Sequence, residues 1–345
     1  MRVMNNIDFC KLTSAILTEN PEWEDVYARY AEEILANKAK YASNSLKFQV
    51  KSPLLVYSSI GKVMTDDSTT KYDIRFAGQS IATVSVRKDG EVLLNANKEQ
   101  AKRAHDKFGF ENSVKIKNEK WNGTSSAVDF RRFFSNMKNS KELQVKSQEH
   151  RIESFLLKEF SESSRDKKLL CNIQPVRLGG KFFQLTTPLK ASTHNPKLSM
   201  DKNRKGATGG GIDILSRVKH SATISRYAVM ELKDENVKNE SQEDAMHQAI
   251  TYATFMAFLF RSESGKKWWN ILRPEAYSEK SVPEHIDLDV VTIMPNEGAS
   301  RESEMDDIEV EDKNTTLHLY TLYYKTDNEG NPISFSGSLT EAIMK

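Results

Sequence analysis

Two apolar runs, GGGIDIL at residues 209–215 and RYAVMELK at residues 226–233, decide how the second half of this chain folds. Both predict short β-strands, and the charged residues between them form the connecting loop. Side chains two apart in a strand point to the same face, so Glu231 and Lys233 project together while Met230 and Leu232 face a core. Asp213 stands at the start of the first run. If the runs pair, two carboxylates and one ammonium meet at one edge of a sheet.

This combination of charges suits the hydrolysis of phosphodiester bonds. Carboxylate oxygens are natural ligands of Mg²⁺, which keeps several waters and also binds phosphate oxygens. Such an ion polarises a phosphoryl group and lowers the pKa of a bound water. Lys233 beside it can orient or help deprotonate the attacking water, or offset charge on the phosphorus. We therefore expect Mg²⁺ or Mn²⁺ as cofactor, held by Asp213, Glu231 and the backbone carbonyl of Leu232.

The arrangement resembles the PD-(D/E)xK nuclease superfamily, which has the restriction-endonuclease-like fold. Asp213 matches the aspartate of the motif and Glu231-Leu232-Lys233 matches its E-x-K, although Ile212 and not proline precedes Asp213. Members commonly carry Gln-x-x-x-Tyr on the helix after E-x-K, and Gln248 and Tyr252 fit this pattern. The resemblance covers roughly residues 147–324. It implies a metal-dependent endo- or exodeoxyribonuclease in which Asp213, Glu231 and Lys233 are catalytic and Gln248 and Tyr252 support them.

The resemblance also implies a catalytic glutamate on the first core helix, expected at residues 147–160. Glu149 and Glu153 are the two candidates. At ~100° per residue, the apolar stripe of this helix centres near Glu149, with Glu153 further to its side. We prefer Glu149 and keep Glu153 as the alternative.

Length and composition set the frame for this interpretation. At 345 residues the chain suits two or three domains, and its net charge of +2 does not by itself indicate a nucleic-acid partner. Two cysteines cannot build a disulfide scaffold or a zinc site by themselves, which favours a reducing compartment. No segment has the apolar core of a signal peptide or the ~20 apolar residues of a membrane span. We expect a cytoplasmic protein without a membrane partner.

The pattern predicts an α/β protein with a separate N-terminal α+β domain over residues 1–140. This domain would supply DNA binding, specificity or a surface for a partner. Helical stripes start at Pro21 and at residues 98 and 127, and four β-like runs lie between residues 54 and 94, with Asp89-Gly90 as a hairpin turn. The nuclease-like domain, residues 147–345, has a mixed central sheet flanked by helices. Its expected elements are a helix at 147–160, strands near 181–185, 213 and 226–232, a helix at 241–261, and strands at 288–294 and 317–324. Residues 297–313 form an acidic, poorly structured insertion.

Basic residues flank the expected metal site, where we expect contact with a phosphate backbone. They are Lys202, Arg204, Lys205, Arg217, Lys219 and Arg226. The pair Arg131-Arg132 and the helix from residue 98 are further basic clusters in the first domain. The expected partner is DNA, with RNA as an alternative, and homodimerisation stays open.

Other interpretations compete with the nuclease. An E-x-K triplet is common in a charged chain, as Glu311-Asp312-Lys313 illustrates, and by itself it predicts an exposed ion pair at a strand end. A non-catalytic nucleic-acid-binding or assembly protein with the same fold is the main alternative. An acyl hydrolase built on Ser80 is a third, although no Asp and His partners can be assigned to it.

Overall fold

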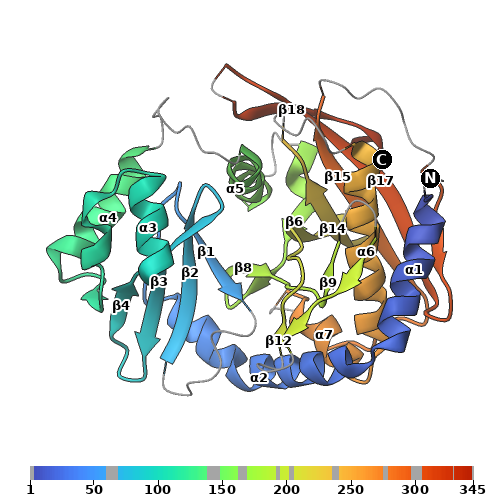
Figure 1. Cartoon of the computed structure of the whole chain (residues 1–345), viewed down its shortest axis with the longest axis horizontal. Coiled ribbons are helices and arrows are strands. Elements are labelled where there is room, and N and C mark those ends of the chain that lie inside the picture. The colour runs from blue at the N-terminus through green and yellow to red at the C-terminus, as the bar shows by residue number, and fades with distance from the viewer. Residues whose placement is uncertain are drawn as a thin grey trace. The chain divides into compact units, whose positions relative to one another are not determined.

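A computed structural model describes residues 4–59, 69–137, 148–161, 169–191, 195–201, 206–234, 241–274, 279–296, 305–328 and 330–343. The fold is of the mixed α/β class, and the chain forms two compact units (Figure 1). The large unit consists of Met1–Leu35, Phe155–Val176 and Gln184–Lys345, and the small unit of Ala36–Ser154 and Arg177–Phe183. In the described parts of the chain, no helix combines the length and apolar character needed to cross a bilayer.

The unit boundaries differ from the single boundary near residue 140 that the sequence suggests. Helix α1 (Asn6–Glu19) belongs to the large unit because it packs on α6 (Gln242–Arg261). The Phe9 ring stacks on His247 with 3.8 Å between centroids. Helices α2 (Glu22–Ser45) and α5 (Gln148–Ser161) each have one part in either unit.

The sheet of the large unit has the strand order β16-β17-β15-β14-β13-β6, with β18 also paired to β17. Strands β6, β13 and β14 are antiparallel neighbours, whereas β15 runs parallel to β14 and β17 runs parallel to β15. The bounds are β6 Ile173–Pro175, β13 Ile214–Lys219, β14 Ser225–Leu232, β15 Ile286–Pro295, β16 Ile308–Val310, β17 Thr315–Thr326 and β18 Pro332–Ser336.

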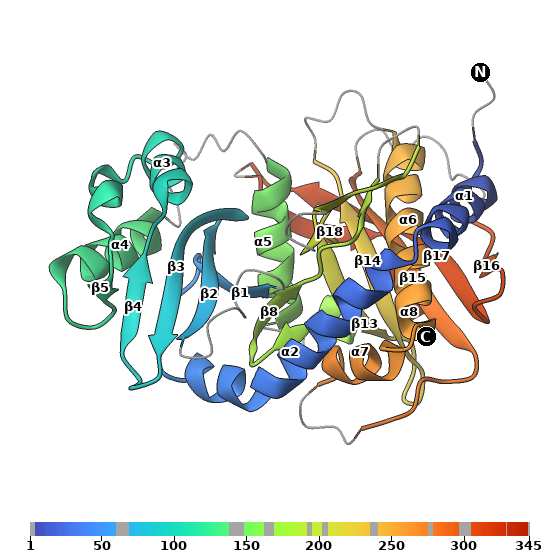
Figure 2. The same ribbon diagram turned by 60° about the horizontal axis from the view of Figure 1, so that its bottom comes forward.

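Helix α6 makes the crossover between parallel strands β14 and β15 and covers one face of the sheet (Figure 2). Ser241 begins the helix with a capping box, because its side chain accepts from Asp244 N–H and the Asp244 side chain accepts from Ser241 N–H. Tyr227 of β14 meets Phe260 of α6 with ring centroids 5.3 Å apart. Odd-numbered residues of β14 therefore face α6, and even-numbered ones face the opposite side. The short helices α7 (Gly265–Ile271) and α8 (Ser338–Ile343) complete the unit.

The small unit is a second sheet, of order β5-β4-β3-β2-β1-β8-β7, with α3 (Lys98–Asp106) and α4 (Ser125–Asn136) packed beside it. Every second residue of β2 is buried, as expected for a sheet with one covered face. These side chains join an aromatic core with Phe108, Phe130 and Phe134 of the helical layer. The bounds are β1 Leu55–Ser59, β2 Thr69–Phe76, β3 Gln79–Arg87, β4 Val92–Asn95, β5 Glu119–Lys120, β7 Arg177–Leu178 and β8 Lys181–Gln184, with the 3-10 helix η1 at Glu111–Lys115.

Three local expectations need correction. The strand expected near residues 181–185 exists as β8, but it pairs with β1 and β7 in the small unit, and β6 takes the place beside β13. The polar, basic segment 192–208, expected as a loop, includes the two-residue strands β10 Lys197–Leu198, β11 Met200–Asp201 and β12 Gly206–Ala207. The short strand β9 Leu189–Lys190 precedes it, and a 3-10 helix, η3, spans Leu169–Asn172. Of the insertion expected to be poorly structured at residues 297–313, residues 297–304 lie outside the described residues, whereas residues 308–310 form β16. Such segments are too short for a periodic pattern to reveal them.

Candidate active site

Asp213 lies directly before the first paired residue of β13, since Ile214 is the partner of Met230. Its Oδ2 accepts a hydrogen bond from the N–H of Leu232, the last residue of β14, at 3.0 Å. In an extended strand the N–H and C=O of one residue point to the same side, so the Leu232 carbonyl also faces the side of Asp213. The next N–H, that of Lys233, points the other way and donates to Ile293 O at 2.9 Å.

Lys233 is buried between a carboxylate and an amide. Its Nζ is 3.0 Å from Glu231 Oε1 and 3.3 Å from Gln248 Oε1. Glu231 and Lys233 are each 5% exposed and Gln248 is 9% exposed. Charge-assisted hydrogen bonds of this kind are stronger than neutral ones, and burial removes competing water. The ammonium is therefore held in one position at the end of β14.

Tyr252 lies one turn after Gln248 on α6 and is buried. Burial raises the pKa of its hydroxyl, and the negative charges of Glu231 and Asp213 raise that pKa further. A hydroxyl that stays protonated beside two carboxylates is a stable hydrogen-bond donor. Gly210 leaves room for the Tyr252 hydroxyl, because a Cβ at residue 210 would lie 1.9 Å from Tyr252 Oη.

The glycine run packs inside the large unit. Gly209 N–H donates to Thr187 O at 3.1 Å and Gly210 N–H donates to Leu189 O at 2.7 Å. A Cβ at Gly209 would lie 2.2 Å from Leu189 O. A side chain does not fit at Gly209 because the backbone of residues 187–189 lies too close, and this packing explains the glycine.

The donor atoms fit a hard divalent ion. Asp213, Glu231 and the Leu232 carbonyl all offer oxygen, the ligand type that Mg²⁺ prefers, and Mg²⁺ completes its octahedron with water and phosphate oxygens. Within the described ranges, no group of three or more His, Cys, Asp or Glu side chains is arranged to hold a metal ion. The fit therefore relies on two carboxylates and one backbone carbonyl.

Glu149 and Glu153 stand on the part of α5 that belongs to the small unit. Glu149 is partly exposed. Glu153 is 3% exposed and accepts a hydrogen bond from Tyr57 Oη at 3.0 Å, and the Arg75 guanidinium stacks on the Tyr57 ring at 4.2 Å. Glu153 is thus part of a polar cluster within the small unit, whereas Asp213, Glu231 and Lys233 form a cluster of the large unit.

The expected phosphate contacts fall into different environments. Lys202, Arg204 and Lys205 lie outside the described residues. Lys219 is exposed, and Arg217 is partly exposed and donates to Ser225 Oγ at 3.1 Å.

Arg226 points to the face of β14 opposite to Glu231 and Lys233. Its Nη1 lies 3.5 Å from Asp289 Oδ1 and 3.4 Å from Tyr320 Oη, and Asp289, which is fully buried, also binds His220 Nε2 at 2.6 Å. We name Arg226, His220, Asp289 and Tyr320 the opposite-face cluster. In this cluster Arg226 neutralises a buried carboxylate.

Two neighbours of the site were not predicted. Tyr324 Oη donates to the Lys233 carbonyl at 2.9 Å, and Asp234, next to Lys233, is buried. Asp234 could have been suspected from its place beside the motif. Tyr324 could not, because its position depends on the parallel pairing of β15 with β17.

Comparison of the chain with family models, curated proteins and solved structures finds no match.

Proposed function

We propose that this protein is a metal-dependent nuclease of the PD-(D/E)xK type that hydrolyses phosphodiester bonds, with DNA as the preferred substrate. One observation carries the proposal: the buried Lys233 ammonium lies 3.0 Å from Glu231, at the strand end where Asp213 accepts the Leu232 N–H. Two carboxylates and a lysine at the ends of neighbouring strands are the groups that this chemistry requires.

Asp213, Glu231 and the Leu232 carbonyl would hold Mg²⁺. When bound, the ion supplies a polarised phosphoryl group and a more acidic water. Gln248 and Glu231 fix the Lys233 ammonium, which would orient the attacking water and offset negative charge on the phosphoryl oxygens. Tyr252 would donate its hydrogen bond to a phosphate oxygen or a water beside the carboxylates.

The topology of the large unit adds support. The order of antiparallel β6, β13 and β14, then α6, then parallel β15, agrees with the order of elements expected around the motif, apart from the exchange of β8 for β6. Gln248 and Tyr252 of α6 lie on the side of Glu231 and Lys233, as the resemblance implies.

The test is cleavage of linear, circular and single-stranded DNA, and of RNA, with Mg²⁺ or Mn²⁺ and with a chelator. We expect metal-dependent cleavage that disappears in Asp213→Asn, in Glu231→Gln and in Lys233→Met, and that persists in Glu311→Gln. Glu311→Gln is the matched control for Glu231→Gln, because Glu311 belongs to the same E-x-K spacing but is exposed and paired with the exposed Lys11. Each variant is checked for folding by circular dichroism.

Full cleavage by Asp213→Asn or Lys233→Met, or cleavage that resists chelation, would refute the proposal. Absence of cleavage together with absence of Asp213-dependent Mn²⁺ binding in calorimetry would favour the non-catalytic nucleic-acid-binding alternative.

A further inference from the structure

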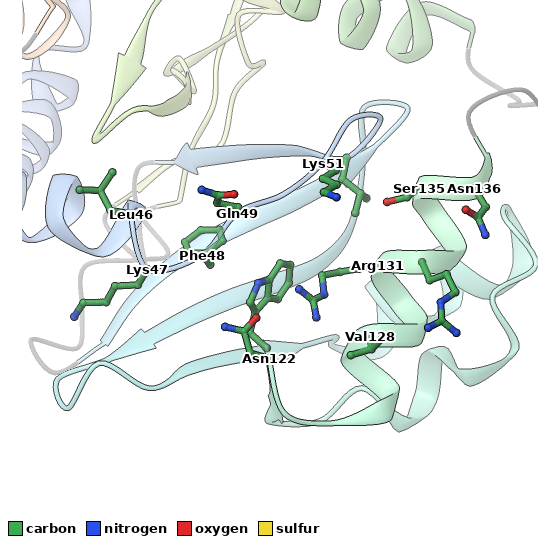
Figure 3. A pocket seen from close by; sticks show the side chains of 13 residues that line it. Leu46, Lys47, Phe48, Gln49, Lys51, Asn122, Val128, Arg131, Ser135 and Asn136 are labelled. Atoms are coloured by element: carbon green, nitrogen blue, oxygen red, sulfur yellow. The ribbon is translucent and has the colours of Figure 1, made fainter.

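The small unit contains a pocket of about 650 Å³ that is separate from the candidate active site. It lies between the segment that follows α2, residues 46–54, and helix α4, with Trp121 and Asn122 beside them (Figure 3). All of these residues belong to the small unit. The volume falls within the range of about 300–1,000 Å³ that is common for ligand sites.

The charged residues that line this pocket are all cations: Lys47, Lys51, Arg131 and Arg132. Among the described residues of its lining, none is Asp or Glu. Lys47, Lys51 and Arg132 are exposed, and the contact of Arg132 with Asp129 is 3.9 Å long between two exposed side chains. Such a surface pair offsets little charge. The pocket therefore attracts anions.

The remaining lining residues form an apolar floor and provide polar groups that can both donate and accept hydrogen bonds. Phe48 and Trp121 are buried beneath the pocket, and the Arg131 guanidinium stacks on the Trp121 ring at 4.6 Å. Stacking holds the guanidinium at the pocket, where its Nε donates to Ala127 O at 3.3 Å and its two terminal nitrogens can donate to an anion. Gln49, Asn122, Asn136 and Ser135 provide amide and hydroxyl groups.

We propose that this pocket binds an unpaired nucleotide within a single-stranded nucleic acid. Arg131, Arg132, Lys47 and Lys51 would contact the phosphates, and the amide groups would contact the edge of the base. A strand that can turn one base outward matches a concave site, whereas the ridges of an intact duplex do not enter one. The inference is independent of the chemistry at Asp213, because every lining residue lies in the small unit.

The experiment is fluorescence anisotropy with labelled oligonucleotides of about 12 nucleotides, close to the usual site sizes of single-strand binders. The full chain is used with a chelator so that cleavage does not interfere. Single-stranded DNA, single-stranded RNA and duplex DNA form three arms, and a free mononucleotide is added as competitor. Because binding is measured with metal removed and without turnover, a failure of this proposal is distinguishable from a failure of the nuclease proposal.

The decisive variant is Lys51→Ala/Arg132→Ala. Its control is Lys98→Ala/Lys102→Ala, which removes the same charge from exposed positions of α3 in the same unit. We expect the pocket pair to weaken single-strand binding by about tenfold or more and to reduce the salt dependence, while the control changes affinity by less than about threefold.

Equal losses of single-strand affinity in the two double variants would show that binding depends on general charge attraction, and would overturn the proposal. Binding of duplex as tight as that of single strands would also overturn it. So would binding of the free mononucleotide in the absence of strand binding.

Discussion

Replacing Lys233 by Met tests the electrostatic core of the site without relying on activity. The change keeps an unbranched side chain but removes the ammonium that lies 3.0 Å from Glu231 Oε1 and 3.3 Å from Gln248 Oε1. Glu231, which is 5% exposed, then loses its cation. Removing one partner of a buried ion pair costs about 3–5 kcal/mol, because the other charge is left without compensation.

The double variant Glu231→Gln/Lys233→Met removes both charges. We expect it to recover at least about 2 kcal/mol of the free energy of unfolding relative to Lys233→Met, since the uncompensated carboxylate is gone. Lys219→Met, at an exposed position of β13, is the control and should stay within about 0.5 kcal/mol of the wild type.

Divalent ions extend this comparison to the metal site. Lys233→Met retains Asp213 and Glu231, so Mg²⁺ or Mn²⁺ should stabilise it by about 2.7 kcal/mol at a concentration near 100 times the dissociation constant. Asp213→Asn/Glu231→Gln should gain nothing from the metal. Urea unfolding with and without metal measures all of these differences through shifts in midpoint at constant slope.

Glu231 and Lys233 are not a coupled pair if Lys233→Met costs less than about 1 kcal/mol, or if the double variant is as unstable as the single one. Equal stabilisation of Asp213→Asn/Glu231→Gln by the metal would place the ion elsewhere.

Three further outcomes follow from the structure. Gly210→Ala should reduce cleavage at least about tenfold and cost about 1–3 kcal/mol, because its Cβ would lie 1.9 Å from Tyr252 Oη, whereas Gly123→Ala, whose nearest neighbour is 3.4 Å away, should behave like the wild type in both assays. His247 has its pKa lowered from 6.5 to about 4 by burial, so between these values the unfolded chain binds a proton that the folded chain does not. Stability should therefore fall by on the order of 1–3 kcal/mol from pH 7 to pH 4 for this residue, and urea unfolding of His247→Leu should lack that share of the pH dependence. Asp289→Asn should lower the free energy of unfolding by about 3–5 kcal/mol, since it removes the buried carboxylate that Arg226 contacts at 3.5 Å, yet the folded fraction should still cleave DNA. Loss of cleavage in fully folded protein would contradict this separation of the two faces.

Local patterns in the sequence were sufficient for several elements. The β-like runs between residues 54 and 94 are β1 to β4, the Asp89-Gly90 turn joins β3 to β4 with Gly90 at φ +89°, and the helix expected at 241–261 is α6. These segments carry clear periodicity or a strong turn or cap signal. Helix α1 also carries a local signal, since the Asn5 side chain caps it by accepting from Asp8 N–H, and Phe9, Thr13 and Leu17 share a buried face.

The sequence by itself determined which residues stand at the ends of the two motif strands, because strand length, alternation and the order of Asp213, Glu231 and Lys233 are local properties. The face of Arg226 was also within reach of the sequence, since residues 226 and 231 differ by an odd number along one strand. Only the tertiary structure decided that Gln248 Oε1 lies 3.3 Å from Lys233 Nζ, that Tyr324 binds the Lys233 carbonyl, and that β6 in place of β8 completes the sheet. Those contacts join segments far apart in the chain. Several strand pairings satisfy the local pattern equally well, and only the burial of the complete core selects one of them.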